Sequence, residues 1–258
     1  MKKLSEMLGY APIDIHSHFN HGVLGDVLRG EDAVAQKSDL DFLFSEYENI
    51  GIECGAFSTY ASVLRGDRIP EENDYLWELA HKDERIYQWV VLHPEVEKTF
   101  AQAKRMLGDR KVLGIKLHSR CQGYDIEAHG DKLFSFANEM GATVVIHPDK
   151  TEILPDFCNK YPNMRLILAH LEGPLHVNAI KKAKYGNLYT DTSGGASSRN
   201  NALEYAVREI GADKILFGTD TYSAAFQAGR VALARISDEE KKMILRDNAL
   251  RLFPHAFK

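Results

Sequence analysis

Eight short apolar runs, each followed by a stretch with helical character, recur along a chain of 258 residues. The runs lie at residues 11–16, 52–58, 86–92, 112–117, 142–146, 164–169, 187–191 and 214–218. Each has the length of a strand, and runs that are apolar throughout are typical of parallel strands with both faces buried. Because parallel strands need long crossovers, the stretches between them are expected to be helices. The alternation therefore predicts a (β/α)8 barrel, regular or distorted.

The segments between the runs carry ordinary helix signals. They predict helices near residues 40–50, 71–82, 96–107, 131–140, 153–160 with an interruption at Pro155, 175–184, 202–210 and 238–252. Ser237 and Glu240 match a capping box at the start of the last one. The length fits one domain over residues 1–258. A doubly wound open sheet is the alternative, but no Gly-x-Gly-x-x-Gly follows the first run.

Composition excludes several classes of protein. The formal net charge of -5 gives no reason to expect nucleic acid or an acidic membrane surface as partner. Cys54, Cys121 and Cys158 are scattered and odd in number, which argues against a disulfide framework. No stretch resembles a membrane span or a signal-peptide core. We therefore expect a cytoplasmic protein whose partner is a small molecule, and we leave a homo-oligomer open.

Residues that can bind a metal follow the apolar runs. His16 and His18 are two residues apart, so on a strand both side chains point to the same face. The carboxyl ends of all barrel strands meet at one end, where barrel active sites lie. Side chains from different strand ends therefore converge, and these predict a divalent metal site. The other polar residues at the ends of predicted strands are Lys116, His118, His147, His170 and Asp220.

The types of donor select the metal and its chemistry. Imidazoles and a carboxylate without thiolates suit Zn²⁺ first, with Mn²⁺, Fe²⁺ or Co²⁺ as alternatives, bound as one ion or two. A metal with an open coordination position lowers the pKa of bound water to about 7 and polarises a substrate carbonyl. Asp220 is placed to accept the proton of such a water.

Several motifs at these strand ends resemble those of the amidohydrolase superfamily. They are His16-x-His18, His147, Leu168-Ala169-His170 and Leu216-Phe217-Gly218-Thr219-Asp220. The stretches Gly114–His118 and Leu188–Ser193 resemble more closely the amidohydrolase-2 group, the metal-dependent hydrolases with a TIM-barrel fold. The resemblance extends from Ile13 to the last predicted helix.

The resemblance implies a set of metal ligands. His16, His18, His147 and Asp220 would bind the metal. His170 would be a further ligand or a catalytic acid or base beside it.

Other residues would act around the metal. Lys116 would be a carboxylated bridge between two metals, as in some members, or an unmodified lysine that contacts substrate. His118 and Arg120 are further candidates for substrate binding. Asp191 either pairs with a ligand histidine or caps a helix.

The resemblance also implies an activity. A metal-dependent hydrolase of an amide, ester or lactone, with Asp220, His170 and Lys116 as catalytic residues, is the first expectation. A non-oxidative decarboxylase of the same group is the alternative, and a non-catalytic small-molecule-binding barrel is the third. Pro148-Asp149 and Thr221-Tyr222 depart from the pattern of the group in loops that would contact substrate. The resemblance therefore identifies no particular substrate.

Overall fold

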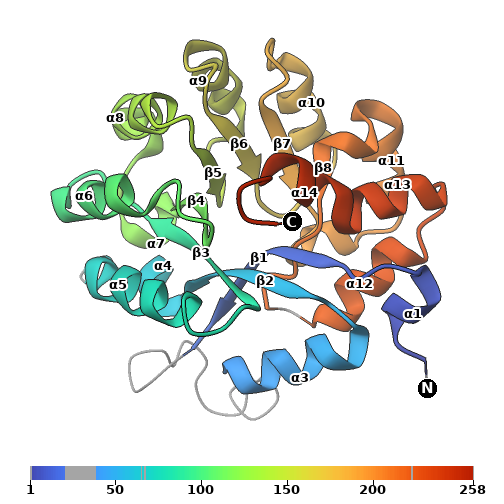
Figure 1. The fold of residues 1–258 in the computed structure, drawn as a ribbon. Coiled ribbons are helices and arrows are strands. Elements are labelled where there is room, and N and C mark those ends of the chain that lie inside the picture. Colours follow the sequence, from blue (N-terminus) through green and yellow to red (C-terminus); the bar gives the residue numbers. More distant parts are fainter. Residues whose placement is uncertain (1, 21–38, 65, 67, 222, 258) are drawn as a thin grey trace, which may run out of the picture.

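A computed structural model describes residues 2–20, 39–64, 66, 68–221 and 223–257. Eight parallel strands follow one another in chain order through one curved sheet with helices around it (Figure 1), which confirms the predicted distorted (β/α)8 barrel. The strands are β1 (Ile13–Phe19), β2 (Cys54–Thr59), β3 (Ile86–Val91), β4 (Val112–Leu117), β5 (Thr143–Ile146), β6 (Arg165–Leu168), β7 (Leu188–Asp191) and β8 (Ile215–Leu216).

The predicted helices are present, with some differences. Pro155 lies in the first turn of its helix, where its fixed φ and missing N–H are tolerated, so it does not interrupt the helix. The predicted capping box of Ser237 and Glu240 is formed. The helices are α1 (Leu4–Leu8), α3 (Leu40–Ile50), α4 (Tyr60–Leu64), α5 (Ile69–Ala80), α6 (Glu97–Met106), α7 (Ser119–Gln122), α8 (Ile126–Glu139), α9 (Leu154–Lys160), α10 (Pro174–Lys182), α11 (Ala202–Ile210), α12 (Ala224–Ala232), α13 (Asp238–Lys242) and α14 (Asn248–Leu252).

Three helices near the strand ends, α4, α7 and α12, were not predicted from sequence, and α7 is a single turn in a stretch with the polar character of a loop. α4 is a single short turn directly after β2, and α12 contains Gly229, which weakens the helical signal. The last predicted helix is divided into α13 and α14 by a π-helical turn at Met243–Asp247. Within the described part of the chain, no helix combines the length and the apolar character that crossing a membrane would require.

The interior of the barrel is filled from the end opposite the strand C-termini. Figure 1 shows the C-terminal segment after α14, drawn in dark red, turning into the ring of strands. Phe253 packs against Trp89 with ring centroids 5.8 Å apart, and Phe257 packs against Tyr87 at 4.7 Å. The Trp89 indole N–H donates to the carbonyl oxygen of Ile15 over 2.7 Å. This apolar plug fills the interior from that end, and barrel active sites lie at the opposite end, where the strands terminate.

The barrel closes where β1 meets the residues after β8, because β8 itself has only two residues. The Ile15 N–H donates to the Phe217 carbonyl oxygen over 3.0 Å, and the N–H groups of Thr219 and Asp220 donate to the His16 carbonyl oxygen over 3.0 and 2.8 Å. These bonds fix Asp220 beside the first strand.

Asp14 holds this seam together. Its fully buried carboxylate accepts hydrogen bonds from the His16 N–H at 3.0 Å and the Thr219 N–H at 3.2 Å. It also accepts from the Thr219 hydroxyl at 2.6 Å and the Tyr47 hydroxyl at 2.5 Å. One carboxylate therefore ties β1, α3 and the segment after β8 to one another.

We predict that Asp14→Asn destabilises the protein by about 2–4 kcal/mol, because an amide nitrogen cannot accept the donors that surround it. Urea denaturation should be measured at pH 8, since burial raises the pKa of Asp14 to about 7 and the carboxylate predominates above that pH. Asp41→Asn, on the exposed first turn of α3, is the matched control and should change stability by less than about 0.5 kcal/mol. Equal stability of the two variants would contradict the role of Asp14 at the seam.

Candidate metal and substrate site

A cavity of about 210 Å³ lies at the ends of the strands. One part of its wall is polar and comes from the ends of five strands, while the other part is largely apolar and comes from α4. The polar residues are His18, Lys116, His118, His147, His170 and Asp220, and the residues of α4 are Tyr60, Val63 and Leu64. The cavity therefore combines the predicted metal-site residues with a wall that the sequence did not indicate.

An irregularity in β1 lets the histidines reach this end of the barrel. Ile13 and Ile15 belong to the apolar cluster inside the barrel, whereas His16 and His18 face the site. The alternation of a regular strand would send His16 to the other face from Ile15. The pairing of β1 with β2 shifts between Asp14 and Ser17, and a β-bulge of this kind re-aims the side chains beyond it.

The tautomers of His16 and His18 follow from their partners. His16 Nδ1 lies 2.8 Å from Asp191 Oδ2, and His18 Nδ1 lies 3.0 Å from the Ser58 carbonyl oxygen. Burial lowers the pKa of both rings, that of His16 to about 3, so each carries one N–H. Because these oxygens accept, each ring donates from Nδ1 and turns the Nε2 lone pair inward.

Three acceptor atoms consequently meet in the cavity with no hydrogen between them. Asp220 Oδ1 lies 3.3 Å from His18 Nε2 and 3.8 Å from His16 Nε2. Although burial opposes it, the imidazoles of His16, His18 and His170 beside Asp220 hold the pKa of its carboxyl group well below its usual range. One donor atom from each residue lies within 4.8 Å of the others. Two imidazole nitrogens and a carboxylate oxygen in this arrangement fit a divalent cation.

A second group of possible ligands, His16, His170 and Asp191, is also close together. Its centre is already satisfied by a hydroxyl, because Ser193 Oγ lies 3.1 Å from His16 Nδ1 and 3.0 Å from His170 Nδ1 and donates to Asp191 Oδ1. This group is therefore a hydrogen-bonded support, and the fit to a metal rests on His16, His18 and Asp220.

The Lys116 amine forms a hydrogen bond with His16 Nε2, the nitrogen that would also bind the metal. Its Nζ is 2.7 Å from His16 Nε2, and the side chain is about 1% exposed. Burial lowers the pKa of Lys116 to about 8, while the carboxylates of Asp220 and Asp191 oppose this shift. A metal on His16 and the lysine would compete for the same nitrogen, so a bound metal would free the Lys116 amine for another partner.

The remaining predicted residues lie around this group. His147 lines the cavity and its Nδ1 is 2.9 Å from His170 Nε2, but it is outside the cluster of three close donors. The His118 ring stacks on His147 with centroids 4.3 Å apart. Arg120 is exposed on α7 and does not line the cavity. His170 Nδ1 is 3.9 Å from Asp220 Oδ2, beside the metal-type cluster.

Backbone strain accompanies two of these residues. His170 has φ 80° and Asp220 has φ 55°, a region that residues with a Cβ rarely adopt. The His170 N–H donates to Asp191 Oδ1 over 3.1 Å, and the Asp220 N–H is held by β1. The fold thus imposes unfavourable conformations where they aim functional side chains at the cavity.

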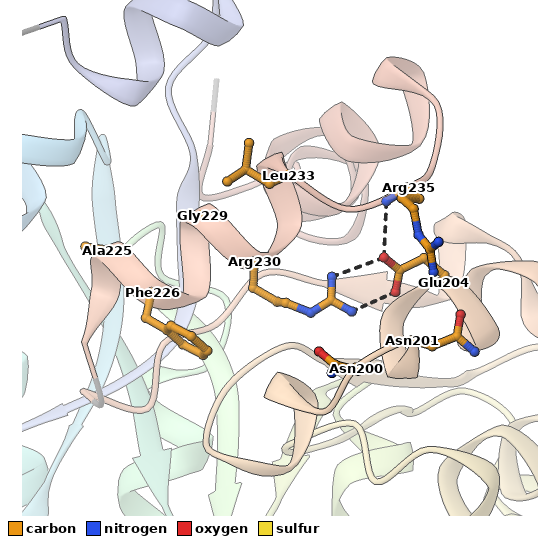
Figure 2. Close-up of a pocket in the computed structure, with 9 residues that line it drawn as sticks. All are labelled: Asn200, Asn201, Glu204, Ala225, Phe226, Gly229, Arg230, Leu233 and Arg235. Atoms are coloured by element: carbon orange, nitrogen blue, oxygen red, sulfur yellow. Dashed lines mark hydrogen bonds and ion pairs between the residues drawn. The ribbon is translucent and has the colours of Figure 1, made fainter.

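A larger hollow of about 770 Å³ lies between α11 and α12 (Figure 2). Phe226 and Leu233 are exposed on it, and Arg230 forms a 2.7 Å ion pair with Glu204. None of the residues drawn there belongs to the wall of the histidine cavity. The groups able to bind a metal are therefore in the smaller cavity.

Comparison with known proteins agrees with this geometry. A model of the family Amidohydrolase (Amidohydro_2) matches residues 13–255. No curated protein matches the chain in sequence.

Solved structures with the same fold include several decarboxylases. A 2,6-dihydroxybenzoate decarboxylase from Rhizobium has a TM-score of 0.75 at 18% identity, covering 95% of this chain and 98% of its own. A 5-carboxyvanillate decarboxylase from Sphingomonas paucimobilis has a TM-score of 0.75 at 16% identity, covering 95% and 99%. A dihydroxybenzoic acid decarboxylase from Polaromonas sp. JS666, with bound manganese and the inhibitor 2-nitroresorcinol, has a TM-score of 0.74 at 20% identity, covering 95% and 97%.

We predict that His176 makes the protein less stable in acid. Burial lowers its pKa from 6.5 to about 4 in the folded chain, so its contribution is complete above pH 6.5 and is lost as the pH falls toward 4. This single residue should add up to about 1.4 kcal/mol per pH unit to the slope of unfolding free energy against pH. His176→Gln should reduce that slope below pH 6.5 and leave it unchanged at higher pH. Parallel profiles for the two proteins would contradict the prediction.

Proposed function

Because the chain belongs to the amidohydrolase family, we propose that it is a metal-dependent, non-oxidative decarboxylase of a small aromatic acid. The hydrolase that the sequence analysis placed first has less support, since the similar solved structures named above are decarboxylases. A binding protein without turnover has no support, because the family and these relatives are enzymes. The decarboxylase was the alternative that the sequence resemblance implied.

The make-up of the cavity is the observation that carries the proposal. Its volume of about 210 Å³ is below the 300–1,000 Å³ of pockets for drug-sized ligands, so it suits a molecule with a single ring. Val63, Leu64 and the Tyr60 ring offer an apolar surface to that ring. Lys116 and the metal-type cluster on the other side offer positive charge to a carboxylate.

His16, His18 and Asp220 would hold the metal, with His147 facing the same cavity. When bound, a divalent ion would polarise the substrate oxygens and stabilise negative charge as the carboxylate leaves. The manganese in the Polaromonas relative supports Mn²⁺ alongside Zn²⁺, and the donor set suits either. We propose a single ion, since Ser193 already satisfies the neighbouring group of His16, His170 and Asp191.

The reaction replaces one bond to a ring carbon. The bond from that carbon to the carboxylate breaks, CO₂ leaves, and the carbon takes one proton, so no oxidant or reductant is needed. Lys116 would bind a carboxylate oxygen before the bond breaks. His170 has both ring nitrogens engaged, by Ser193 and by His147.

Asp220 is therefore the residue to which we assign the proton transfer. Its side chain remains 15% exposed in the cavity, whereas those of His16 and His18 are 1% and 5% exposed. Its low pKa keeps it ionised in the free enzyme, so it must take up a proton before it can deliver one. The proton that Asp220 delivers to carbon from Oδ2 would thus come from an acidic group of the bound substrate.

Labelled water distinguishes decarboxylation from hydrolysis. With Mn²⁺ or Zn²⁺ supplied, we expect hydroxybenzoic acids to lose CO₂ in D₂O and to gain one deuterium at the carbon that carried the carboxylate. Esters, amides and lactones of the same rings, incubated in H₂¹⁸O, should gain no ¹⁸O. Mass spectrometry measures both, with Asp220→Asn as the inactive control. Incorporation of ¹⁸O without carbon deuteration would establish the hydrolase instead.

Lys116→Met tests the role of the lysine. We expect kcat/KM to fall by roughly 10²-fold, because a positioned donor to the substrate is lost, while metal binding is retained or tightened as His16 Nε2 is freed. Lys111→Met is the matched control, because Lys111 is also buried but its Nζ donates to backbone carbonyls away from the cavity. That variant should lose stability and keep kcat.

Loss of metal from Lys116→Met, together with activation of the wild-type enzyme by bicarbonate, would overturn this role. Those results would instead identify Lys116 as a carboxylated ligand that bridges two metals. Metal content by elemental analysis and activity with added bicarbonate measure both.

A further inference from the structure

A chain of hydrogen bonds runs from a buried carboxylate to His147, the predicted ligand that lies outside the close cluster. Ser193 Oγ donates to Asp191 Oδ1, and His170 Nδ1 lies 3.0 Å from the same Ser193 oxygen. His170 Nε2 lies 2.9 Å from His147 Nδ1. The chain joins the residues that follow β5, β6 and β7, and none of its links involves the apolar wall from α4.

We infer that Ser193 is a positioning residue that fixes the tautomers of His170 and His147 and so turns a lone pair of His147 into the cavity. This inference rests on the proposed metal site, for which that lone pair would be a donor. It gives a role to Ser193, which ends one of the motifs behind the resemblance but is not among the predicted site residues.

The direction of each bond follows from what its atoms can do. Asp191 Oδ1 accepts the backbone N–H groups of His170 and Ser193 over 3.1 and 2.9 Å, and the Ser193 hydroxyl donates to the same oxygen. The single hydrogen of the Ser193 hydroxyl is used there. Ser193 Oγ must then accept from His170, which places the ring hydrogen of a neutral His170 on Nδ1.

The same reasoning extends to His147. With its hydrogen on Nδ1, His170 presents a lone pair at Nε2, and this lone pair can only accept from the Nδ1–H of His147. The hydrogen of His147 is thereby held on Nδ1, and its Nε2 keeps a free lone pair. Because Asp191 also accepts from His16 Nδ1, one carboxylate sets three imidazoles, and Ser193 transmits its effect to two of them.

The backbone around Ser193 packs closely against the imidazole of His170. Ser193 is fully buried, and its N–H donates to Asp191 Oδ1 over 2.9 Å. Gly194 has φ 67°, and a Cβ there would lie 2.6 Å from His170 Nδ1. A Cβ at Gly218 would lie 3.1 Å from that of Ser193. Glycine on both sides therefore lets the hydroxyl approach the imidazole.

Ser193→Ala removes the hydroxyl and adds no volume. In metal-free protein with ¹⁵N-labelled histidine, the ring ¹⁵N shifts should report Nδ1–H forms of His170 and His147 in the wild type and their loss in the variant. His16 should keep its Nδ1–H, because its bond to Asp191 remains. The dissociation constant for Zn²⁺, measured by competition with a chromophoric chelator, should rise about 10-fold or more.

Ser197→Ala is the matched control. The Ser197 hydroxyl bonds to the Thr192 carbonyl oxygen over 2.6 Å and supports the same turn, yet it has no hydrogen bond with a histidine among the described residues. It should leave the tautomers and the Zn²⁺ affinity unchanged. Asp191→Asn, which removes the origin of the chain, should alter all three rings.

Unchanged His170 and His147 shifts in Ser193→Ala, or the same change in Ser197→Ala, would overturn the inference. The proposed function is tested separately on the wild-type protein. Failure of that protein to bind Mn²⁺ or Zn²⁺, or to release CO₂, would contradict it. The tautomer measurement needs neither metal nor substrate, so the two failures are distinguishable.

Discussion

The site depends on the closure of the barrel at its seam. His16 and His18 belong to β1, while Asp220 follows β8, so the three donors of the metal-type cluster come together only when the first and last strands meet. The hydrogen bonds of Asp14 to Thr219 and of His16 to Asp220 hold that junction. Stability and chemistry are thus coupled at one place, because the contacts that complete the sheet also position the carboxylate.

Much of the fold and part of the site could be predicted from local sequence. Buried parallel strands are continuous apolar runs, and barrel geometry brings the residue after each run to one end, which is why His16, His118, His147, His170 and Asp220 could be found. Alternation along a strand can place two histidines on one face. It cannot place the bulge between Asp14 and Ser17, which depends on pairing with β2.

Residues that depend on contacts between distant segments were missed for the same reason. Ser193 is an ordinary small residue in a polar run, and only its distance to His170 reveals a role. Val63 and Leu64 lie on a single helical turn after β2, which has no periodic signal of its own. The ligand-type residues are shared by hydrolases and decarboxylases of the resembled group. The choice between hydrolysis and decarboxylation therefore depends on the other residues that line the cavity, which local sequence patterns do not identify.

The apolar plug also has a consequence for the order in which the chain can fold during synthesis. Phe253 and Phe257, which fill the barrel against Trp89 and Tyr87, are made only after all eight strands. Until they leave the ribosome, the growing sheet has an unfilled interior and an unpaired edge at β1. Such intermediates expose apolar surface and are prone to aggregate. The core of the barrel can therefore be completed only after Phe253 and Phe257 have been synthesised.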